Sequence, residues 1–579
     1  MKNQMHAVLP TLVVAGVCLL GAAPALSADA SCSRSDSAGA SGSFDKKRQI
    51  FWGDLHTHTA FSMDAYVLNT TQTPRDAYVF ARGGPSKLHT GGTHQLKRPL
   101  DFAAVTDHAE YFGLSQVCRD EPDRAYCKEL TAAAKEDSTR GFVEIFLPLI
   151  VSGERNCLVD ADECRIAERT MWQRSIDAAN AANTPCEFTA FVASEWTASP
   201  GNLHWHRNLI YANANVPDRA INSFDQPTQE KLWEGLDAQC KAEAGCRVLA
   251  IPHNSNIGMG GAFQTAGHSA ATHALRARFE KLVEIHQHKG SSECYSQSNF
   301  SDEACDFEFM LPIPLRNKLR AQPRELTDSE HRDIASGYVR DTLAKGLDLR
   351  ATTGINPFRY GFVGATDSHS ARPGDVEEDH WAGSLGQWDR SAETRANFPV
   401  YNPGGITGIW AEENTRASLF AALERRDVFA TSGPRIALEF EASFTPDEQC
   451  ELAGKDAVRM GATLQTPKRN RHAKRKPTFT VRALKDTAAL QRIDIVKLTL
   501  ASGSDERIEQ TVYSVSGSKR GRSDWCLAWQ DDNYKPQQPA LWYARVLQVP
   551  TKRWDGKTLI RERAWSSPIW ALPSGYAER

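Results

Sequence analysis

The sequence predicts an α/β protein with a β-rich C-terminal domain, and three observations support that fold class. From Arg48 to about Thr431, short β-rich runs alternate with helical patterns, which is typical of parallel strands joined by crossover helices. Polar side chains directly follow several of these runs, and α/β proteins build their sites at the carboxyl ends of strands. After Pro434, apolar and polar residues alternate, which indicates a separate β-rich domain.

Residues 1–28 are predicted to be a secretory signal peptide. They combine a basic start, the apolar run Leu12–Leu20 and a small-residue cleavage region. An uncleaved membrane anchor is the alternative, but prolines within the segment weaken it, and no other segment is apolar enough to span a membrane. Residues 29–47 are predicted to be a flexible leader, because Ser31–Phe44 is rich in Ser and Gly. We therefore expect a periplasmic or secreted protein.

Strands and helices are predicted in order from Arg48 onward. The strands of the first region are Ile50–Leu55, Phe102–Thr106, Phe188–Ala193, Val248–Ile251, Leu282–Ile285, Phe362–Ala365 and Ile406–Trp410, with a further strand at Asn208–Tyr211. Helical patterns between them include Glu163–Asn180 and Arg416–Arg426. The strands of the β-rich domain are Ile436–Phe440, Thr478–Ala483, Ile493–Leu500, Leu541–Val549 and Ser567–Leu572.

Composition limits the classes of function. Apolar residues make up 41% of the 579 residues, which is typical of a globular protein. The chain has 68 Lys and Arg against 71 Asp and Glu, so no overall basic charge favours nucleic acid as the principal partner. Lys468–Lys476 is the exception, with six basic residues in nine. We interpret it as a solvated loop, and binding to nucleic acid or an acidic surface is the alternative.

The cysteines predict disulfide bonds. There are thirteen, and removal of Cys18 with the signal peptide leaves the even number that paired thiols require. Close spacing favours four pairs: Cys118 with Cys127, Cys157 with Cys164, Cys240 with Cys246, and Cys294 with Cys305. Elimination favours Cys450 with Cys526 and Cys32 with Cys186, although the sequence alone does not fix the connectivity. Cys-x-x-Cys does not occur, so thiolate metal sites and redox dithiols are not expected.

Histidine and carboxylate residues recur after the predicted strands. His56 and His58 follow the first strand, and residues two apart in an extended chain point the same way, so both imidazoles can reach one ion. Later positions of this kind are Asp64, Asp107-His108, Glu195, His204, His206, His253, Asp367 and His369. Nitrogen and oxygen ligands without thiolate suit zinc, manganese or iron, and a carboxylate can bridge two ions.

In this order the residues resemble the PHP (polymerase and histidinol phosphatase) superfamily. Its members have a distorted seven-stranded β/α barrel and a cluster of up to three metals. More narrowly, residues 51–59 (FWGDLHTHT), 365–369 (ATDSH) and 410–416 (WAEENTR) resemble an exported bacterial branch long labelled as a domain of unknown function. The resemblance implies a PHP-like metal-dependent barrel over residues 48–434 and a β-rich domain over residues 435–579.

The resemblance also implies a set of ligands for two or three divalent ions. His56, His58, Glu195 and Asp367 would surround one ion, Asp64, His108 and His369 would hold a second, and Glu195 would bridge to a third bound by His206 and His253. Many PHP proteins have histidine at the position of Asp64, and the carboxylate favours ions such as manganese. His204 is the alternative to His206. We choose His206 because it directly precedes the strand Asn208–Tyr211.

We therefore predict a metal-dependent hydrolase of small phosphate esters that uses metal-activated water. Asp367 and Glu195 are the expected catalytic carboxylates, and Arg372 is expected to clamp phosphate oxygens. The alternative for Arg372 is a loop arginine paired with Glu377 or Glu378. Asp107 either orients His108 or caps the turn after its strand.

Two other functions stay open. One is an amidohydrolase-type C–N or C–O hydrolase, which also begins with His-x-His but normally has a metal-bridging lysine. The other is a non-catalytic periplasmic metal-binding module. The sequence leaves the substrate, the native metal and the oligomeric state undetermined.

Overall fold

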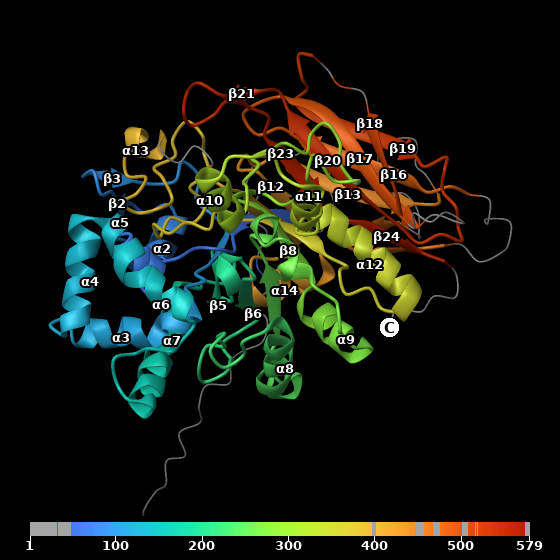
Figure 1. The fold of residues 1–579 in the computed structure, drawn as a ribbon. Helices are drawn as coiled ribbons and strands as arrows, with labels where there is room; N and C mark the ends of the chain where they lie inside the picture. Colours follow the sequence, from blue (N-terminus) through green and yellow to red (C-terminus); the bar gives the residue numbers. More distant parts are fainter. Residues whose placement is uncertain are drawn as a thin grey trace, which may run out of the picture.

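Figure 1 shows the fold in a computed structural model, which describes Cys32 and residues 48–396, 401–445, 457–466, 475–500, 508–515, 517 and 519–573. The predicted signal peptide, the leader apart from Cys32, and residues 468–474 of the basic stretch lie outside the described residues. The domain boundaries at residues 28, 47 and 434 stay predictions.

One large mixed sheet organises the described chain. Its hydrogen-bonded order is β15-β24-β20-β23-β12-β11-β1-β4-β5-β6-β7, and β17 and β18 extend it from β20. The strands nearest the predicted site are β1 (Gln49–Asp54), β4 (Phe102–Ala104), β5 (Thr189–Trp196), β6 (Arg207–Tyr211), β7 (Val248–Pro252), β11 (Ile406–Ala411) and β12 (Val428–Thr431). A three-stranded sheet contains β8 (Leu282–Gln287), β9 (Gly290–Ser291) and β10 (Gly361–Gly364).

The predicted parallel arrangement is correct only in part. β1, β4 and β5 are parallel neighbours, and β8 is parallel to β10. β6, however, runs antiparallel to both β5 and β7, and β11 runs antiparallel to β1. The chain between β5 and β6 is too short for a crossover helix, so β6 returns beside β5 as in a hairpin.

The hydrogen-bond pairings of the described strands do not show a closed seven-stranded barrel. β11 pairs with β12, and β12 pairs with β23 (Arg563–Ser566) near the C-terminus. The large sheet continues from β12 into the C-terminal strands, while β10 packs against β11 and β12, and β8 packs against β7. The fold is therefore mixed α/β with large sheets.

Helices cover the sheet where the sequence presents an apolar face. α7 (Ala161–Ala182) begins after Asp160, whose carboxylate accepts hydrogen bonds from the backbone of Asp162 and Glu163. Met171 and Trp172 of this helix are buried against the strands together with side chains of α2 (Pro74–Ala81) and α3 (Phe112–Asp120). Other helices are α1 (Met63–Val67), α4 (Ala125–Glu136), α8 (Gln229–Gln239), α9 (Ala270–Phe279), α10 (Ile313–Ala321), α11 (Asp328–Ala335), α12 (Val339–Thr353) and α14 (Arg416–Arg425).

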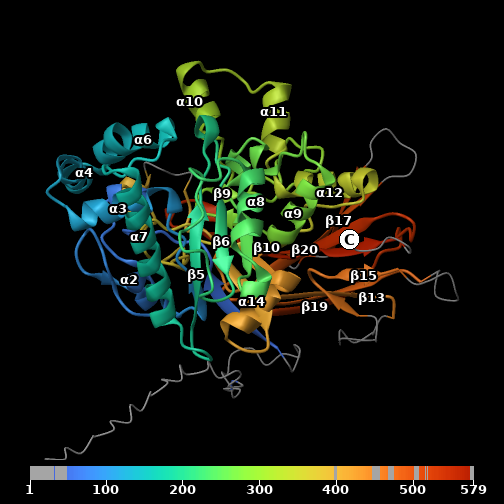
Figure 2. The same cartoon turned by 90° about the horizontal axis from the view of Figure 1, so that it is seen from below.

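The chain after residue 434 is β-rich. Figure 2 shows its strands on the side of the molecule opposite α2, α3 and α7. They are β13 (Ala437–Ser443), β14 (Val458–Arg459), β15 (Thr463–Gln465), β16 (Thr478–Leu484), β17 (Leu490–Leu500), β18 (Ile508–Val515), β19 (Asp524–Gln530), β20 (Ala540–Gln548), β23 and β24 (Ile569–Leu572). β13, β14, β16 and β19 form a second sheet. Phe440, Phe479 and Trp542 are buried together in one core cluster that joins both sheets.

Buried ion pairs join this part to the rest of the molecule. Glu293 Oε1 accepts hydrogen bonds from Arg340 (2.7 Å), Tyr543 (2.9 Å) and Arg545 (2.9 Å). Its Oε2 accepts one from Trp565 Nε1 (2.7 Å). Arg340 and Arg545 are fully buried, so these contacts hold the two parts together through satisfied charges.

Five of the six predicted disulfides are confirmed. They are Cys32–Cys186, Cys118–Cys127, Cys157–Cys164, Cys240–Cys246 and Cys294–Cys305. Cys526 is also disulfide-bonded, and its predicted partner Cys450 lies outside the described residues. This many disulfides indicates an oxidising compartment. Among the described residues, no helix has both the length and the apolar composition needed to cross a membrane.

Candidate metal centre

Strand ends bring the predicted ligands together. His56 and His58 follow β1, Glu195 lies near the end of β5, His253 follows β7 and Asp367 follows β10. Because β1, β4 and β5 are parallel, their carboxyl ends meet on one side of the sheet. Backbone hydrogen bonds from Asp367 N to His56 O (2.9 Å) and from His58 N to Ser368 O (2.8 Å) join the loops.

Four ligand atoms form a cage with the dimensions of a metal site. His56 Nε2 lies 3.2 Å from His58 Nε2, 3.3 Å from Glu195 Oε2 and 3.3 Å from Asp367 Oδ1. His58 Nε2 lies 3.3 Å and 3.2 Å from the same two oxygens. Ligand atoms that bind one zinc ion tetrahedrally at about 2.0 Å lie roughly 3.3 Å apart, which is the spacing of these five pairs.

The protons around this cage favour a cation at its centre. His56 Nδ1 lies 3.0 Å from Glu284 Oε2, so an ionised Glu284 accepts its proton and leaves a lone pair on Nε2. Asp367 Oδ1 is buried and has no hydrogen-bond partner among the described residues. Buried lone pairs that face one another repel unless a positive charge lies between them. The donor set therefore fits a divalent metal.

Asp64 is the centre of a second group. Its Oδ2 lies 3.0 Å from His108 Nε2 and 2.8 Å from His369 Nε2, and His58 is close enough to join them. His369 Nδ1 must donate to the carbonyl oxygen of Asp367 (2.8 Å), so a neutral His369 presents a lone pair to Asp64. A proton or a cation must then lie between the two side chains.

Glu195 connects the first group to a third. Its Oε1 lies 2.8 Å from His206 Nδ1 and 3.1 Å from His253 Nε2, whereas its Oε2 belongs to the first cage. One carboxylate thus offers one oxygen to each group, which is the arrangement of a bridging ligand. The ring of His204 lies 4.7 Å from that of His206 between centroids, tilted by 34°, and its buried Nδ1 has no partner among the described residues.

Neighbouring charges keep the carboxylates ionised despite their burial. Burial raises the pKa of Asp64, Glu195 and Asp367, but the charges of neighbouring histidines outweigh it and hold each pKa well below its usual value. Burial lowers the pKa of His253 to about 3, so this imidazole is neutral and can bind an ion. Without an ion, and despite burial, neighbouring carboxylates raise the pKa of His56 and His58, and that of His108 to about 10, so a bound ion would displace protons from these imidazoles.

Asp107 holds the loop after β1. Its carboxylate accepts hydrogen bonds from Thr59 N (2.6 Å) and Thr59 Oγ1 (2.7 Å). The side chain of His108 instead contacts Thr197 Oγ1 and Asp64. Neither predicted role of Asp107, as orienter of His108 or as cap of its own turn, matches these contacts.

Arg372 does not point toward the ligand groups. Its side chain is only 2% exposed, and its guanidinium donates to the carbonyl oxygens of Gly383 (2.7 Å) and Ala382 (3.3 Å). Its acidic neighbour is Asp375, at 3.6 Å, rather than Glu377 or Glu378. The guanidinium braces the loop after β10, and this position does not support the predicted phosphate clamp.

Sequence reasoning missed the polar residues on β8 and the turn after it. Besides Glu284, they are Gln287, His288 and Lys289, which approach Asp367 Oδ2. Gln287 Nε2 lies 2.9 Å and His288 Nε2 lies 3.3 Å from that oxygen, and Lys289 Nζ forms an ion pair with it. The sequence offered a sign of these residues, because Glu284, His286 and Gln287 place polar side chains in a short strand that begins with apolar residues.

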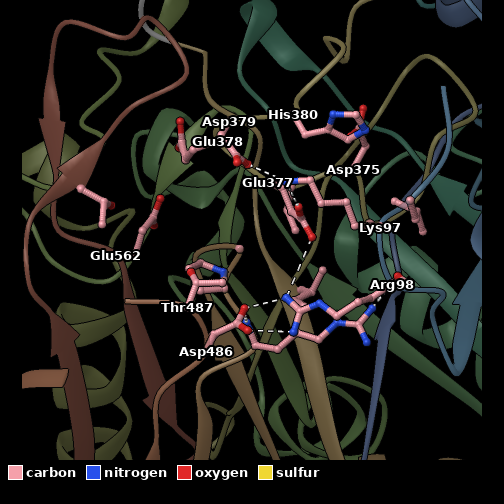
Figure 3. Close-up of a pocket in the computed structure, with 18 of the residues that line it drawn as sticks. Lys97, Arg98, Asp375, Glu377, Glu378, Asp379, His380, Asp486, Thr487 and Glu562 are labelled. Atoms are coloured by element: carbon pink, nitrogen blue, oxygen red, sulfur yellow. Dashed lines mark hydrogen bonds and ion pairs between the residues drawn. The ribbon is translucent and has the colours of Figure 1, made fainter. Parts of the chain in front are cut away.

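A cavity of about 600 Å³ lies beside the loop after β10 (Figure 3), but none of the predicted metal ligands lines it. Lys97 Nζ pairs there with Glu377 at 2.7 Å, and Arg98 pairs with Asp486 at 2.7 Å. These opposite charges neutralise one another, so the chemical groups of interest are those at the strand ends.

Fold and geometry together define a mixed α/β protein with a buried histidine and carboxylate centre of metal-site dimensions. The chain belongs to the family described as "Protein of unknown function (DUF3604)", whose model matches residues 45–526 and 516–573.

Two known proteins are similar to parts of the chain. An uncharacterized protein of Chlamydia pneumoniae is 26% identical over 302 residues, which is 50% of this chain but only 34% of that relative's length. A solved two-domain structure from Bacteroides vulgatus, described as containing a predicted PHP-like metal-dependent phosphoesterase, has 12% identity and a TM-score of 0.28. That alignment covers 84% of this chain and 96% of the other.

Proposed function

We propose that the protein is an exported, metal-dependent hydrolase of small phosphate esters with a PHP-like site. One observation carries the proposal: Glu195 offers one oxygen to the cage of His56, His58 and Asp367, and the other to His206 and His253. A shared carboxylate suits a centre of two or three divalent ions, with manganese, zinc or iron as the candidates.

Bound divalent ions would supply a water of lowered pKa and offset negative charge on the phosphoryl oxygens. The chain's own residues prepare that chemistry. Glu195 and Asp367 hold their negative charge in a buried site, and Glu284 fixes the proton of His56 on Nδ1. Ser62 lies 3.2 Å from His58 Nδ1 and orients that ring in the same way. No protein nucleophile is required.

The bridging position favours this function over an amidohydrolase. An amidohydrolase normally bridges its ions with a lysine, whereas here the bridging atoms belong to Glu195. The site also argues against a module that only binds metal, because two of its three ligand groups share one buried carboxylate, as in a bridged catalytic centre. The disulfides favour the periplasm or the extracellular space as the place of action.

The test is reconstitution of the full chain with single metals. Protein stripped with a chelator is reloaded with Mn²⁺, Zn²⁺ or Fe²⁺, and bound metal is counted by mass spectrometry. Each form is then assayed on phosphomonoesters, phosphodiesters, amides and neutral carboxylic esters. We expect two or three ions per chain and hydrolysis of phosphate esters that requires a bound metal.

Two results would overturn the proposal. Loaded protein that hydrolyses amides but no phosphate ester would favour the amidohydrolase alternative. Loaded protein that hydrolyses nothing in the panel would favour a metal-binding module.

A further inference from the structure

The turn between β8 and β9 fixes a lysine beside the proposed metal centre. Lys289 occupies this turn, and Asn256 Nδ2 donates to its carbonyl oxygen at 3.1 Å. The next residue, Gly290, has φ of 102°, and a Cβ there would lie 2.2 Å from Glu308 O. Only glycine fits this conformation, so the turn holds the lysine in a defined place.

The two oxygens of Asp367 face different groups. Oδ1 faces His56 and His58, within the cage, whereas Oδ2 forms an ion pair with Lys289 Nζ. The lysine side chain is 13% exposed, compared with 1% for Asp367. Lys289 therefore extends from solvent to the outer side of the centre.

A second cation lies on the same side. Arg316 of α10 has a buried Nε with no hydrogen-bond partner among the described residues. Burial raises the pKa of Tyr401, and the charges of Lys289 and Arg316 both oppose that rise. The Tyr401 ring stacks on His288 at 5.1 Å between ring centroids.

These residues border the ligand groups from outside. α10 packs against the turn Pro200–Asn202, which leads into His204 and His206. Lys289 pairs with the carboxylate of Asp367. Ions bound in the cage would neutralise part of that carboxylate's negative charge and so weaken its attraction for Lys289. Lys289 would then attract another anion.

We propose that Lys289, assisted by Arg316, binds the non-reacting phosphate oxygens of the substrate. This inference rests on the proposed function and assigns the anion-recognition role to Lys289 in place of Arg372. It makes Lys289 a substrate-binding residue and not a metal ligand.

The test compares Lys289→Met, Lys289→Arg and Arg316→Met with the wild type. Lys318→Met is the matched control, because Lys318 lies on α10 but its side chain is 59% exposed and points to Glu330. Binding of inorganic phosphate to the metal-loaded proteins is measured by calorimetry, together with metal content, KM and kcat. Loss of one charged hydrogen bond should weaken phosphate binding roughly 10- to 100-fold in Lys289→Met.

The other variants separate binding from a structural role. Lys289→Arg keeps the charge and should retain most of the phosphate affinity, and Arg316→Met should weaken it less than Lys289→Met. All variants should keep the wild-type metal content, and KM should change more than kcat. If Lys289→Met does not fold, Lys289→Arg and Arg316→Met still test the subsite.

Two results would overturn the inference. Wild-type phosphate affinity in Lys289→Met would show that the lysine does not bind phosphate, even if the wild type hydrolyses phosphate esters. Loss of metal from Lys289→Met would show that the lysine supports Asp367 instead. A wild type that binds phosphate through Lys289 but hydrolyses no phosphate ester would contradict the proposed function and leave the subsite intact.

Discussion

Asp367 has a left-handed backbone conformation, with φ of 54°, that few residues other than glycine, asparagine and aspartate adopt. The hydrogen bond from its N–H to His56 O holds it there. This conformation aims Oδ1 into the cage and Oδ2 toward Lys289. A single residue thus connects the proposed ion site to the proposed anion site.

We expect Asp367→Asn to remove metal from the cage and to abolish hydrolysis. The amide has no negative charge, and its nitrogen cannot replace a carboxylate oxygen as a ligand. Circular dichroism should show an unchanged fold, while mass spectrometry should show fewer ions per chain. Asp379→Asn is the control, since Asp379 lies on the same loop with its side chain 81% exposed and should behave like the wild type. Full turnover by Asp367→Asn would exclude the residue from the site.

Arg372→Lys should act on stability. Lysine cannot reproduce the pair of hydrogen bonds to Gly383 and Ala382, and its ammonium would be buried with poorer partners. We expect the free energy of unfolding to fall by about 1.5 to 3 kcal/mol, measured with urea. KM for a phosphate ester should change little. A large rise in KM with unchanged stability would restore the phosphate clamp.

At the residue scale, the proposed ligands were accessible from the sequence and their neighbours were not. His56, His58 and Asp367 stand after strands in an order that resembles a known family. Glu284 and Lys289 belong to no such motif, and their importance depends on which atoms of His56 and Asp367 they face. Which atoms face one another is decided only when the strands lie side by side in the folded chain.

At the scale of elements, short disulfide loops fix the helices next to the centre. Cys118 of α3 joins Cys127 of α4, nine residues later, and both sulfurs are buried. α1, which carries Asp64, packs against α4. The disulfide therefore supports the element that positions the second ligand group.

Replacing Cys118 and Cys127 together with serine should lower the free energy of unfolding by about 2.5 kcal/mol, because a loop of this size restricts the unfolded chain by about that much. Urea unfolding of the double variant and the wild type tests this value. The two proteins should differ much less after complete reduction. An unchanged midpoint under oxidising conditions would mean that the bond adds no stability.

The sequence located most of the strands nearest the centre, but it missed most of the helices and did not reveal which strands pair. β1, β5, β7, β11 and α7 lie within a few residues of the predicted ranges, because strong apolar patterns and clear caps define them. β12 and β23 were missed. Each has four residues, which is too few for a clear periodic pattern. They pair with each other although more than 100 residues separate them in the sequence.

At the scale of the molecule, buried charges join the C-terminal strands to the rest. Burial raises the pKa of Glu293, but Arg545 and Arg340 outweigh it and leave the pKa below its usual value. The same two arginines lower the pKa of Asp302 despite burial. Both carboxylates thus bind protons less readily in the folded than in the unfolded protein.

This linkage predicts how stability depends on pH. The stabilisation is fully present above the unfolded pKa values of about 4 and is lost as pH falls from there toward the lower folded values. Glu293→Gln should lower the free energy of unfolding at pH 7 by about 3 kcal/mol, because two buried arginines lose a partner. It should also flatten the decline in stability below pH 4.

Urea unfolding at several pH values tests this prediction. Glu303→Gln is the control, since the Glu303 side chain is 66% exposed and its pair with Arg492 should contribute little. If Glu293→Gln unfolds like the control, the network does not join the two parts.

The pairing of β1 with β11 determines when the centre can form. Residue 49 pairs with residue 411, and β12 pairs in turn with the strand at residues 563–566. Contacts between such distant segments are slow to form, and a chain that is still being synthesised or translocated cannot make them. His56 and His58 therefore meet Asp367 only after the chain has reached residue 367, and the sheet beside them is complete only when residues 563–566 pair with β12. If the protein is exported before it folds, any ions bound in the proposed centre should be those available in the compartment where folding ends.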